Sequence, residues 1–125
     1  MTNKIEINTN LFKAISDESR LRIVLLLSVN EMCVCEICET TGLSQPMVSR
    51  HLGLLRTLNI VSTRRAGQWI YYSINREEPL VLSMLSVLIE HLSPSSIFQR
   101  DFDNYAIKRN EEKLCSQKAS LSETK

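Results

Sequence analysis

The sequence predicts a mainly α-helical domain that carries a single β-hairpin. Residues 45–58 and 79–92 contain apolar residues at helical spacing. Between them, residues 60–65 and 68–74 are rich in β-branched and aromatic residues, and they flank Ala66-Gly67, a pair typical of a turn. Three further helices are expected before residue 45, so we expect about five helices in all.

The N-terminal part of the chain predicts a polar arm and two helices. Residues 1–9 are mostly polar, and we expect a flexible arm there. A short helix should span residues 11–16. The next helix should follow Asp17, a favourable N-cap residue, and run through residues 20–29. Its expected core positions are Leu21, Val24, Leu25 and Leu27.

Three cysteines in the pattern Cys-x-Cys-x-x-Cys begin the third predicted helix, at about residues 33–41. Cys33 stands at its expected N-cap, with Glu36 three residues later as in a capping box. Cysteine is not a favoured N-cap residue, and a poor cap costs roughly 1 kcal/mol. A helix N-terminus also lowers the pKa of a thiol, which favours thiolate ligands. Cys35 and Cys38 share a helix face, so the three sulfurs can converge only if the chain near Cys33 departs from helical geometry.

A helix-turn-helix pattern follows these cysteines. Gly42 can end one helix in a left-handed conformation, and Ser44 can cap the next. Val48, Leu52 and Leu55 recur at helical intervals and predict a buried stripe. The exposed face should then carry side chains suited to base edges and phosphates, namely Ser44, Gln45, Ser49, Arg50 and Arg56. A solvated surface helix would show the same polar face, so this pattern alone does not separate the two interpretations.

The predicted hairpin is expected to form a wing beside the helix-turn-helix. Ile70, Tyr72 and Ile74 alternate along its second strand and should face the core. Arg64 and Arg65 lie near the tip, where they could reach phosphates or the minor groove. Residues 40–76 contain five Arg and no acidic residue, although the net charge of the whole chain is only +1. This local positive charge predicts a phosphate-facing surface.

The last predicted helix starts at Pro79 and is unusually apolar. Nine of its thirteen residues from 80 to 92 are apolar, which is too many for one face against one small core. A second buried face implies a partner, so we expect a homodimer.

Length and composition predict one domain in the cytoplasm. We place the domain at residues 10–93, between the arm at 1–9 and a partly disordered extension at 94–125. Phe98, Phe102 and Tyr105 are candidate anchors for the extension. No signal peptide and no apolar run of about 18 residues is visible, so no membrane partner is expected. Four Cys without an export signal favour reduced thiols over a disulfide framework.

Four segments together resemble the arsenic-responsive repressors of the ArsR/SmtB family. They are LFKAISDESRLRIVLLL, EMCVCEIC, LSQPMVSRHLGLLR and RRAGQWIYYSI, and the resemblance covers about residues 10–92. It implies a homodimeric winged helix-turn-helix repressor that leaves double-stranded operator DNA when trivalent arsenic or antimony binds Cys33, Cys35 and Cys38. Three soft ligands suit such an ion, whereas zinc prefers four. No organic cofactor is expected.

Two alternatives use the same three cysteines. Exposed thiols of low pKa oxidise readily, so a redox-sensing repressor is one alternative. A metalloid-buffering protein that does not bind DNA is the other. An enzyme is not expected, because the sequence shows no Cys-x-x-Cys beside a βαβ pattern and no set of nucleophile, base and orienting residue.

Overall fold

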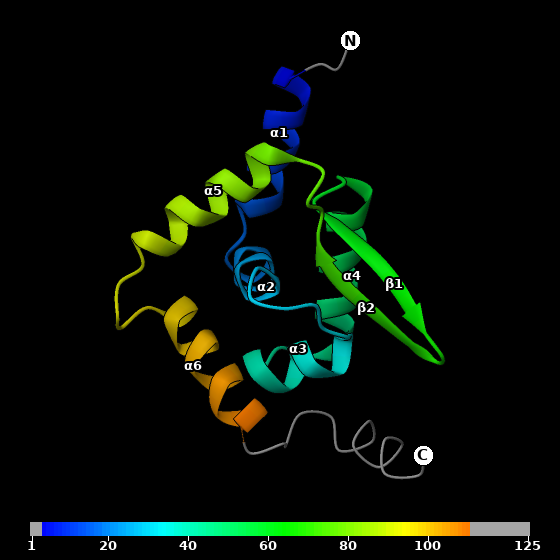
Figure 1. Ribbon diagram of the computed structural model, residues 1–125, viewed down its shortest axis with the longest axis vertical. Coiled ribbons are helices and arrows are strands. Elements are labelled where there is room, and N and C mark those ends of the chain that lie inside the picture. Colours follow the sequence, from blue (N-terminus) through cyan, green and yellow to red (C-terminus); the bar gives the residue numbers. More distant parts are fainter. Residues whose placement is uncertain (1–3, 111–125) are drawn as a thin grey trace.

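The computed structural model describes residues 4–110 of the 125-residue chain. Within these residues it contains six helices and one antiparallel two-stranded sheet (Figure 1). The elements are α1 (Lys4–Ile15), α2 (Glu18–Leu27), α3 (Val34–Thr41), α4 (Gln45–Thr57), β1 (Val61–Ala66), β2 (Trp69–Ile74), α5 (Pro79–Glu90) and α6 (Ile97–Asn110). The predicted fold class, a winged helix-turn-helix made mainly of helices, is confirmed, with six helices in place of about five.

Helix α2 lies at the centre of the molecule, and the other helices surround it (Figure 1). Its residues 23–27 are all 1% exposed or less. A helix enclosed in this way is apolar on nearly every side, as the run Ile23–Leu27 is. The predicted core positions of α2 are buried except Leu21, which packs partly buried against the core.

The predicted signals at the helix ends are confirmed. The Asp17 carboxylate accepts a hydrogen bond from the Arg20 backbone N–H at 3.0 Å and caps α2. Gly42 ends α3 with φ +79°, a left-handed conformation that suits glycine. The Ser44 hydroxyl accepts from the Met47 N–H at 3.4 Å and begins α4. Helix α4 therefore spans nearly the predicted residues, and its stripe of Val48, Leu52 and Leu55 is fully buried. We call α4 the reader helix, because its other face is the one predicted to contact base edges.

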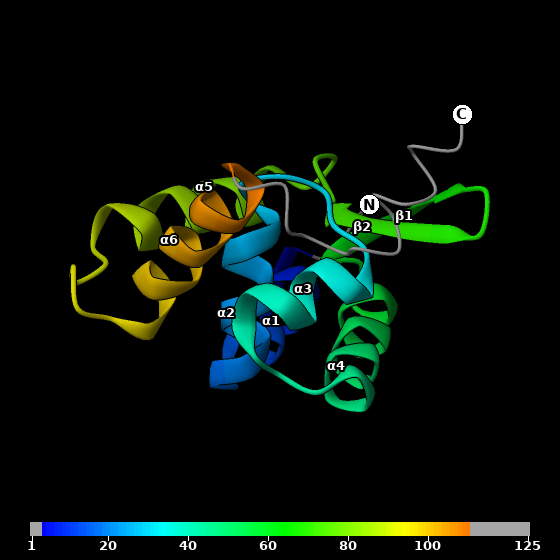
Figure 2. The same ribbon diagram turned by 90° about the horizontal axis from the view of Figure 1, so that it is seen from below.

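The hairpin projects from the helical body beside α4 (Figure 2). Its register pairs Val61 with Ile74 and Ala66 with Trp69. The turn is consequently Gly67-Gln68, one residue later than predicted, and Gly67 has φ +63°. Ile74 is buried and Tyr72 packs partly buried against the core, as expected, whereas Ile70 is half-buried and does not pack against the core. Together β1 and β2 form the wing.

Two segments are more helical than predicted. Helix α1 begins at Lys4, so it extends through most of the 1–9 segment that we expected to be an arm. Helix α6 occupies the first part of the predicted C-terminal extension and contacts α2 and α3. Its expected anchors are confirmed, since Tyr105 is buried and Phe98 and Phe102 pack against the core. The predicted disorder beyond Asn110 lies outside the described residues.

Helix α5 buries only part of its apolar surface within one chain. Val81 and Leu85 are buried, whereas Val87 is 51% and Ile89 40% exposed. Phe12 on α1 is also exposed, at 56%. No helix among the described residues is long and apolar enough to cross a membrane.

Candidate functional site

All seven predicted DNA-contacting side chains are exposed. They come from α4 and its N-cap and from β1: Ser44, Gln45, Ser49, Arg50, Arg56, Arg64 and Arg65. The α4 residues lie beside the buried stripe, so one side of the reader helix packs on the core and the other faces solvent. His51 lies between the two sides, with its Nε2 3.8 Å from Asp17 Oδ2. Burial lowers the pKa of His51, so this imidazole is neutral at pH 7.

Arg64 already has partners in the free protein that the sequence did not reveal. Its Nε donates to Glu31 Oε2 at 3.2 Å, and its Nη2 donates to Glu31 Oε1. The guanidinium also lies over the Tyr71 ring, 4.8 Å from the centroid. The hydrogen bonds with Glu31 raise the pKa of Arg64. Glu31 therefore connects the segment before α3 to the wing.

Cys33 occupies the N-cap of α3, as predicted. Its backbone is extended, with φ −86° and ψ 168°, and the residue is only 2% exposed. The Glu36 carboxylate accepts from the Cys33 backbone N–H at 3.1 Å, and its Oε1 lies 3.4 Å from Cys33 Sγ. This capping arrangement holds the sulfur at the start of the helix. A ligand that binds Cys33 Sγ must therefore compete with the contact between this sulfur and Glu36.

The other two cysteines lie within α3. Cys38 is a half-buried free thiol, and burial, with the nearby Glu39 carboxylate, raises its pKa. The expectation that the helix N-terminus lowers thiol pKa is thus wrong for Cys38, because this residue lies beyond the first turn of α3. Cys35 lies in the first turn of α3, and its Sγ is 3.8 Å from Glu39 Oε1. Cys115 lies outside the described residues.

One cavity of about 550 Å³ brings the three cysteines together with α4 and the wing. Its lining from α3 is Cys33, Val34, Cys35, Cys38 and Glu39; α4 contributes Gln45, and the turn and β2 contribute Gln68, Trp69, Ile70 and Tyr72. In residues 4–110, no three His, Cys, Asp or Glu side chains are arranged to hold a metal ion. The cysteines border a common space, but their sulfurs need rearrangement before they can share a ligand.

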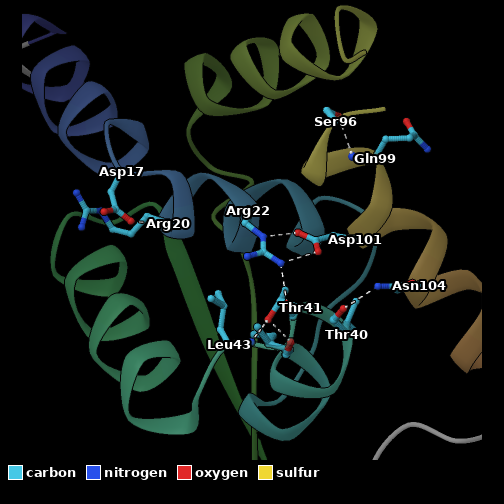
Figure 3. Close-up of polar contacts among 11 residues, drawn as sticks. Asp17, Arg20, Arg22, Thr40, Thr41, Leu43, Ser96, Gln99, Asp101 and Asn104 are labelled. Carbon is cyan, nitrogen blue, oxygen red and sulfur yellow. Dashed lines mark hydrogen bonds and ion pairs between the residues drawn. The ribbon is translucent and has the colours of Figure 1, made fainter. Parts of the chain in front are cut away.

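The opposite end of α3 is held by polar contacts from α2 and α6 (Figure 3). Arg22 and Asp101 form a bidentate ion pair with two 2.9 Å contacts, and their side chains are 9% and 3% exposed. Arg22 Nη2 also donates to the Thr41 carbonyl at 2.7 Å. Asn104 Nδ2 donates to the Thr40 carbonyl at 3.4 Å, and Lys108 Nζ donates to the Glu39 carbonyl. Three successive carbonyls at the end of α3 therefore have side-chain donors.

Comparisons with known proteins agree with this architecture. Residues 17–63 match the family described as bacterial regulatory protein, arsR family. The chain is 46% identical over 83 residues to the arsenic resistance transcriptional regulator ArsR2 of Pseudomonas putida, covering 65% of this chain and 72% of that protein.

Two solved structures are also similar. One is the homodimeric winged helix-turn-helix DNA-binding domain of a possible ArsR-family regulator from Mycobacterium bovis (TM-score 0.60, 30% identity, covering 74% of this chain and 87% of that one). The other is reduced HlyU from Vibrio cholerae (TM-score 0.61, 34% identity, covering 66% and 84%).

Proposed function

Because the chain belongs to the ArsR family of bacterial regulatory proteins, we propose that it represses transcription as a homodimer on operator DNA and is released by trivalent arsenic or antimony. The observation that carries this proposal is the cavity that Cys33, Cys35 and Cys38 share with Gln45 of the reader helix and with the wing. A ligand bound at these sulfurs lies against both elements that face DNA.

The DNA-binding step uses the exposed side of α4 and the wing. Gln45 is the first residue of α4, where side chains of a recognition helix reach base edges in the major groove. Its amide can pair with adenine through two hydrogen bonds. Arg50, Arg56, Arg64 and Arg65 supply positive charge for phosphates, which fixes orientation without reading sequence.

The dimer step uses the apolar surface of α1 and α5. Phe12, Val87 and Ile89 remain exposed in the single chain, and large exposed apolar surfaces are typical of an interface. The homodimeric state of the Mycobacterium bovis relative supports the same assignment. A two-fold dimer places its two reader helices on half-sites about one DNA turn apart, or a multiple of it.

The release step is an exchange at arsenic. Arsenous acid, As(OH)3, reacts with three thiols to give three As–S bonds and three water molecules, so each thiol proton leaves with a hydroxyl group. Cys33 must leave its position beside Glu36 for this to occur, which disturbs the start of α3. Since arsenic then favours a protein conformation different from the DNA-bound one, linkage requires that DNA weakens arsenic binding equally.

A gel-shift titration of the reduced protein on its own upstream DNA, with and without arsenite, tests the proposal. We expect arsenite to release the parent protein. Cys33→Ser should bind DNA at least as well, because serine is the better N-cap, but should resist release because one soft ligand is gone. Cys115→Ser, outside the described residues, is the matched control and should respond like the parent. Release of Cys33→Ser at the parent's arsenite concentration would refute the three-sulfur site.

A redox-sensing repressor is the second candidate, and the position of Cys33, Cys35 and Cys38 around one cavity favours it, because neighbouring thiols can be oxidised to a disulfide. The chain is similar in structure to reduced HlyU, and this supports a test of the oxidation state of its own thiols. Peroxide added to the reduced protein without arsenite separates the two candidates. Release by peroxide, reversed by dithiothreitol, supports redox sensing, whereas release by arsenite alone supports the metalloid site.

A further inference from the structure

The wing is connected to the segment just before α3 by two contacts that lie outside the helix-turn-helix. We propose that ligand binding at the cysteines displaces the wing and withdraws Arg64 from DNA, with Glu31 as the positioning residue of this step. The inference rests on the proposed function, and it names the moving element that this function requires.

The first contact is a backbone bridge one residue before Cys33. The Met32 N–H donates to the Tyr72 carbonyl at 3.0 Å, and the Tyr72 N–H donates to the Met32 carbonyl at 2.8 Å. Met32 is fully buried, so these two hydrogen bonds lie where the wing meets the core. A change in the backbone at Cys33 therefore moves Met32, and Met32 is hydrogen-bonded to Tyr72 of β2.

The second contact is the ion pair of Glu31 with Arg64. It lies next to the backbone bridge and joins the same segment to β1. The other side of the segment is attached to α6, because the Asn30 Oδ1 accepts from the Glu31 N–H at 2.9 Å and its Nδ2 donates to the Tyr105 hydroxyl at 3.0 Å. The position of the Glu31 carboxylate therefore depends on the backbone of residues 30–32, and a shift of this backbone also moves the Arg64 guanidinium that the carboxylate binds.

The far end of α3 resists movement. Arg22, Asn104 and Lys108 donate to its last carbonyls, and the Arg22–Asp101 pair is buried. Helix α3 has only eight residues, so a rearrangement of its sulfurs cannot be absorbed along a long helix. The backbone should therefore move at the Cys33 end of α3, where Met32 and Glu31 contact the wing.

Hydrogen exchange measured by mass spectrometry tests where the movement occurs. With arsenite added to the full-length reduced protein, we expect the amides of Met32 and Tyr72 to exchange at least about tenfold faster, because their mutual hydrogen bonds open. The buried amides of α4 around Val48 and Leu52 should keep their protection. Faster exchange in α4 with unchanged Met32 and Tyr72 would overturn the proposal.

The salt dependence of DNA binding tests the role of Arg64. Each phosphate contact contributes about one unit to the slope of log affinity against log salt. We expect arsenite to reduce the slope of the parent by about one unit per wing. Arg64→Ala should begin with the lower slope and show no such reduction. An equal arsenite-dependent reduction in Arg64→Ala would show that another contact is lost.

Glu31→Gln tests the positioning role, with Glu77→Gln as the matched control. Both remove one negative charge, but Glu77 is an exposed residue after β2 and Glu31 holds Arg64. The arsenite-induced change in operator affinity should shrink by about two- to fivefold in Glu31→Gln, the range of an exposed ion pair, and stay unchanged in Glu77→Gln. Equal changes in both variants would refute the role of Glu31. Failure of the parent to respond to arsenite at all would instead refute the proposed function.

Discussion

The buried ion pair between Arg22 and Asp101 predicts a large stability loss in the variant Asp101→Asn. The side chains are 9% and 3% exposed, and the two contacts are both 2.9 Å. Replacing the carboxylate with an amide removes the charge and one acceptor, while the Arg22 guanidinium stays buried. The Thr41 carbonyl remains as its partner but carries no negative charge. Loss of one member of a buried pair typically costs about 3–5 kcal/mol.

Urea unfolding at a fixed protein concentration measures this cost. With a slope of about 2 kcal/mol per molar urea, a loss of about 4 kcal/mol lowers the midpoint by about 2 M. The concentration must be fixed because the proposed dimer would contribute to apparent stability. Asp103→Asn is the matched control. It lies two residues along α6 and is exposed, so its effect should stay within about 0.5 kcal/mol.

A double variant separates loss of the pair from loss of packing. In Arg22→Met with Asp101→Leu, neither charge remains buried, and such replacements are often neutral or stabilising. We therefore expect the double variant to recover most of the stability that Asp101→Asn loses. Our account of the pair would be refuted if Asp101→Asn unfolded at the parent's midpoint, or if the double variant were less stable than the single one.

Three further measurements follow from the site. Gln45→Ala should lose about 1–3 kcal/mol of discrimination at one base pair if the amide makes two hydrogen bonds to a base; unchanged affinity across operator variants in a binding assay would show that the wrong face was chosen. Because burial raises the pKa of Cys38, its thiol is protonated at neutral pH; exchange of this thiol with one hydroxyl group of neutral arsenous acid then releases water and no net proton. The contribution of Cys38 to arsenite affinity, measured as the difference between the parent and Cys38→Ser, should hence be flat between roughly pH 6 and 8, while the stopped-flow association rate of the parent rises with pH because the thiolate is the attacking form; a rate independent of pH would contradict this. Trp69 is the single tryptophan and borders the cysteine cavity, so its emission should change on arsenite addition and should stay constant in Cys38→Ser.

The features predicted best from sequence are local ones. Asp17, Gly42 and Ser44 stand at helix ends whose backbone groups need a partner within three residues, so each residue type carries its own signal. The stripe of Val48, Leu52 and Leu55 repeats at a helical period for the same reason. The unusual N-cap at Cys33 was found in this way, and the structure gives it the predicted position.

The features missed are contacts between distant polar residues. Arg22 and Asp101 are 79 residues apart, and Glu31 and Arg64 are 33 apart. Charged residues at such separations follow no periodic pattern, so nothing in either segment identifies the partner in the other. The ordering of three cysteines around one cavity likewise depends on how the wing folds over α3, which local spacing does not define.

Helix α6 is an intermediate case. Phe98, Phe102 and Tyr105 recur at intervals of four and three residues, which is a helical signal. The polar residues between them lower the mean hydropathy of the segment, so the sequence alone favours a short extension. Its polar side chains also contact α2 and α3, so the residues that make the segment polar add to the attachment provided by its aromatic residues.

The position of Gln45 on the rim of the cysteine cavity bears on how such a protein can be redesigned as a biosensor. A common strategy exchanges the reader helix to change the promoter that is controlled and leaves the sensing part alone. Here the side chain proposed to read a base also borders the cavity proposed to bind the inducer. A new operator preference obtained at this residue would alter the dose at which the sensor responds, so promoter choice and detection threshold have to be selected together.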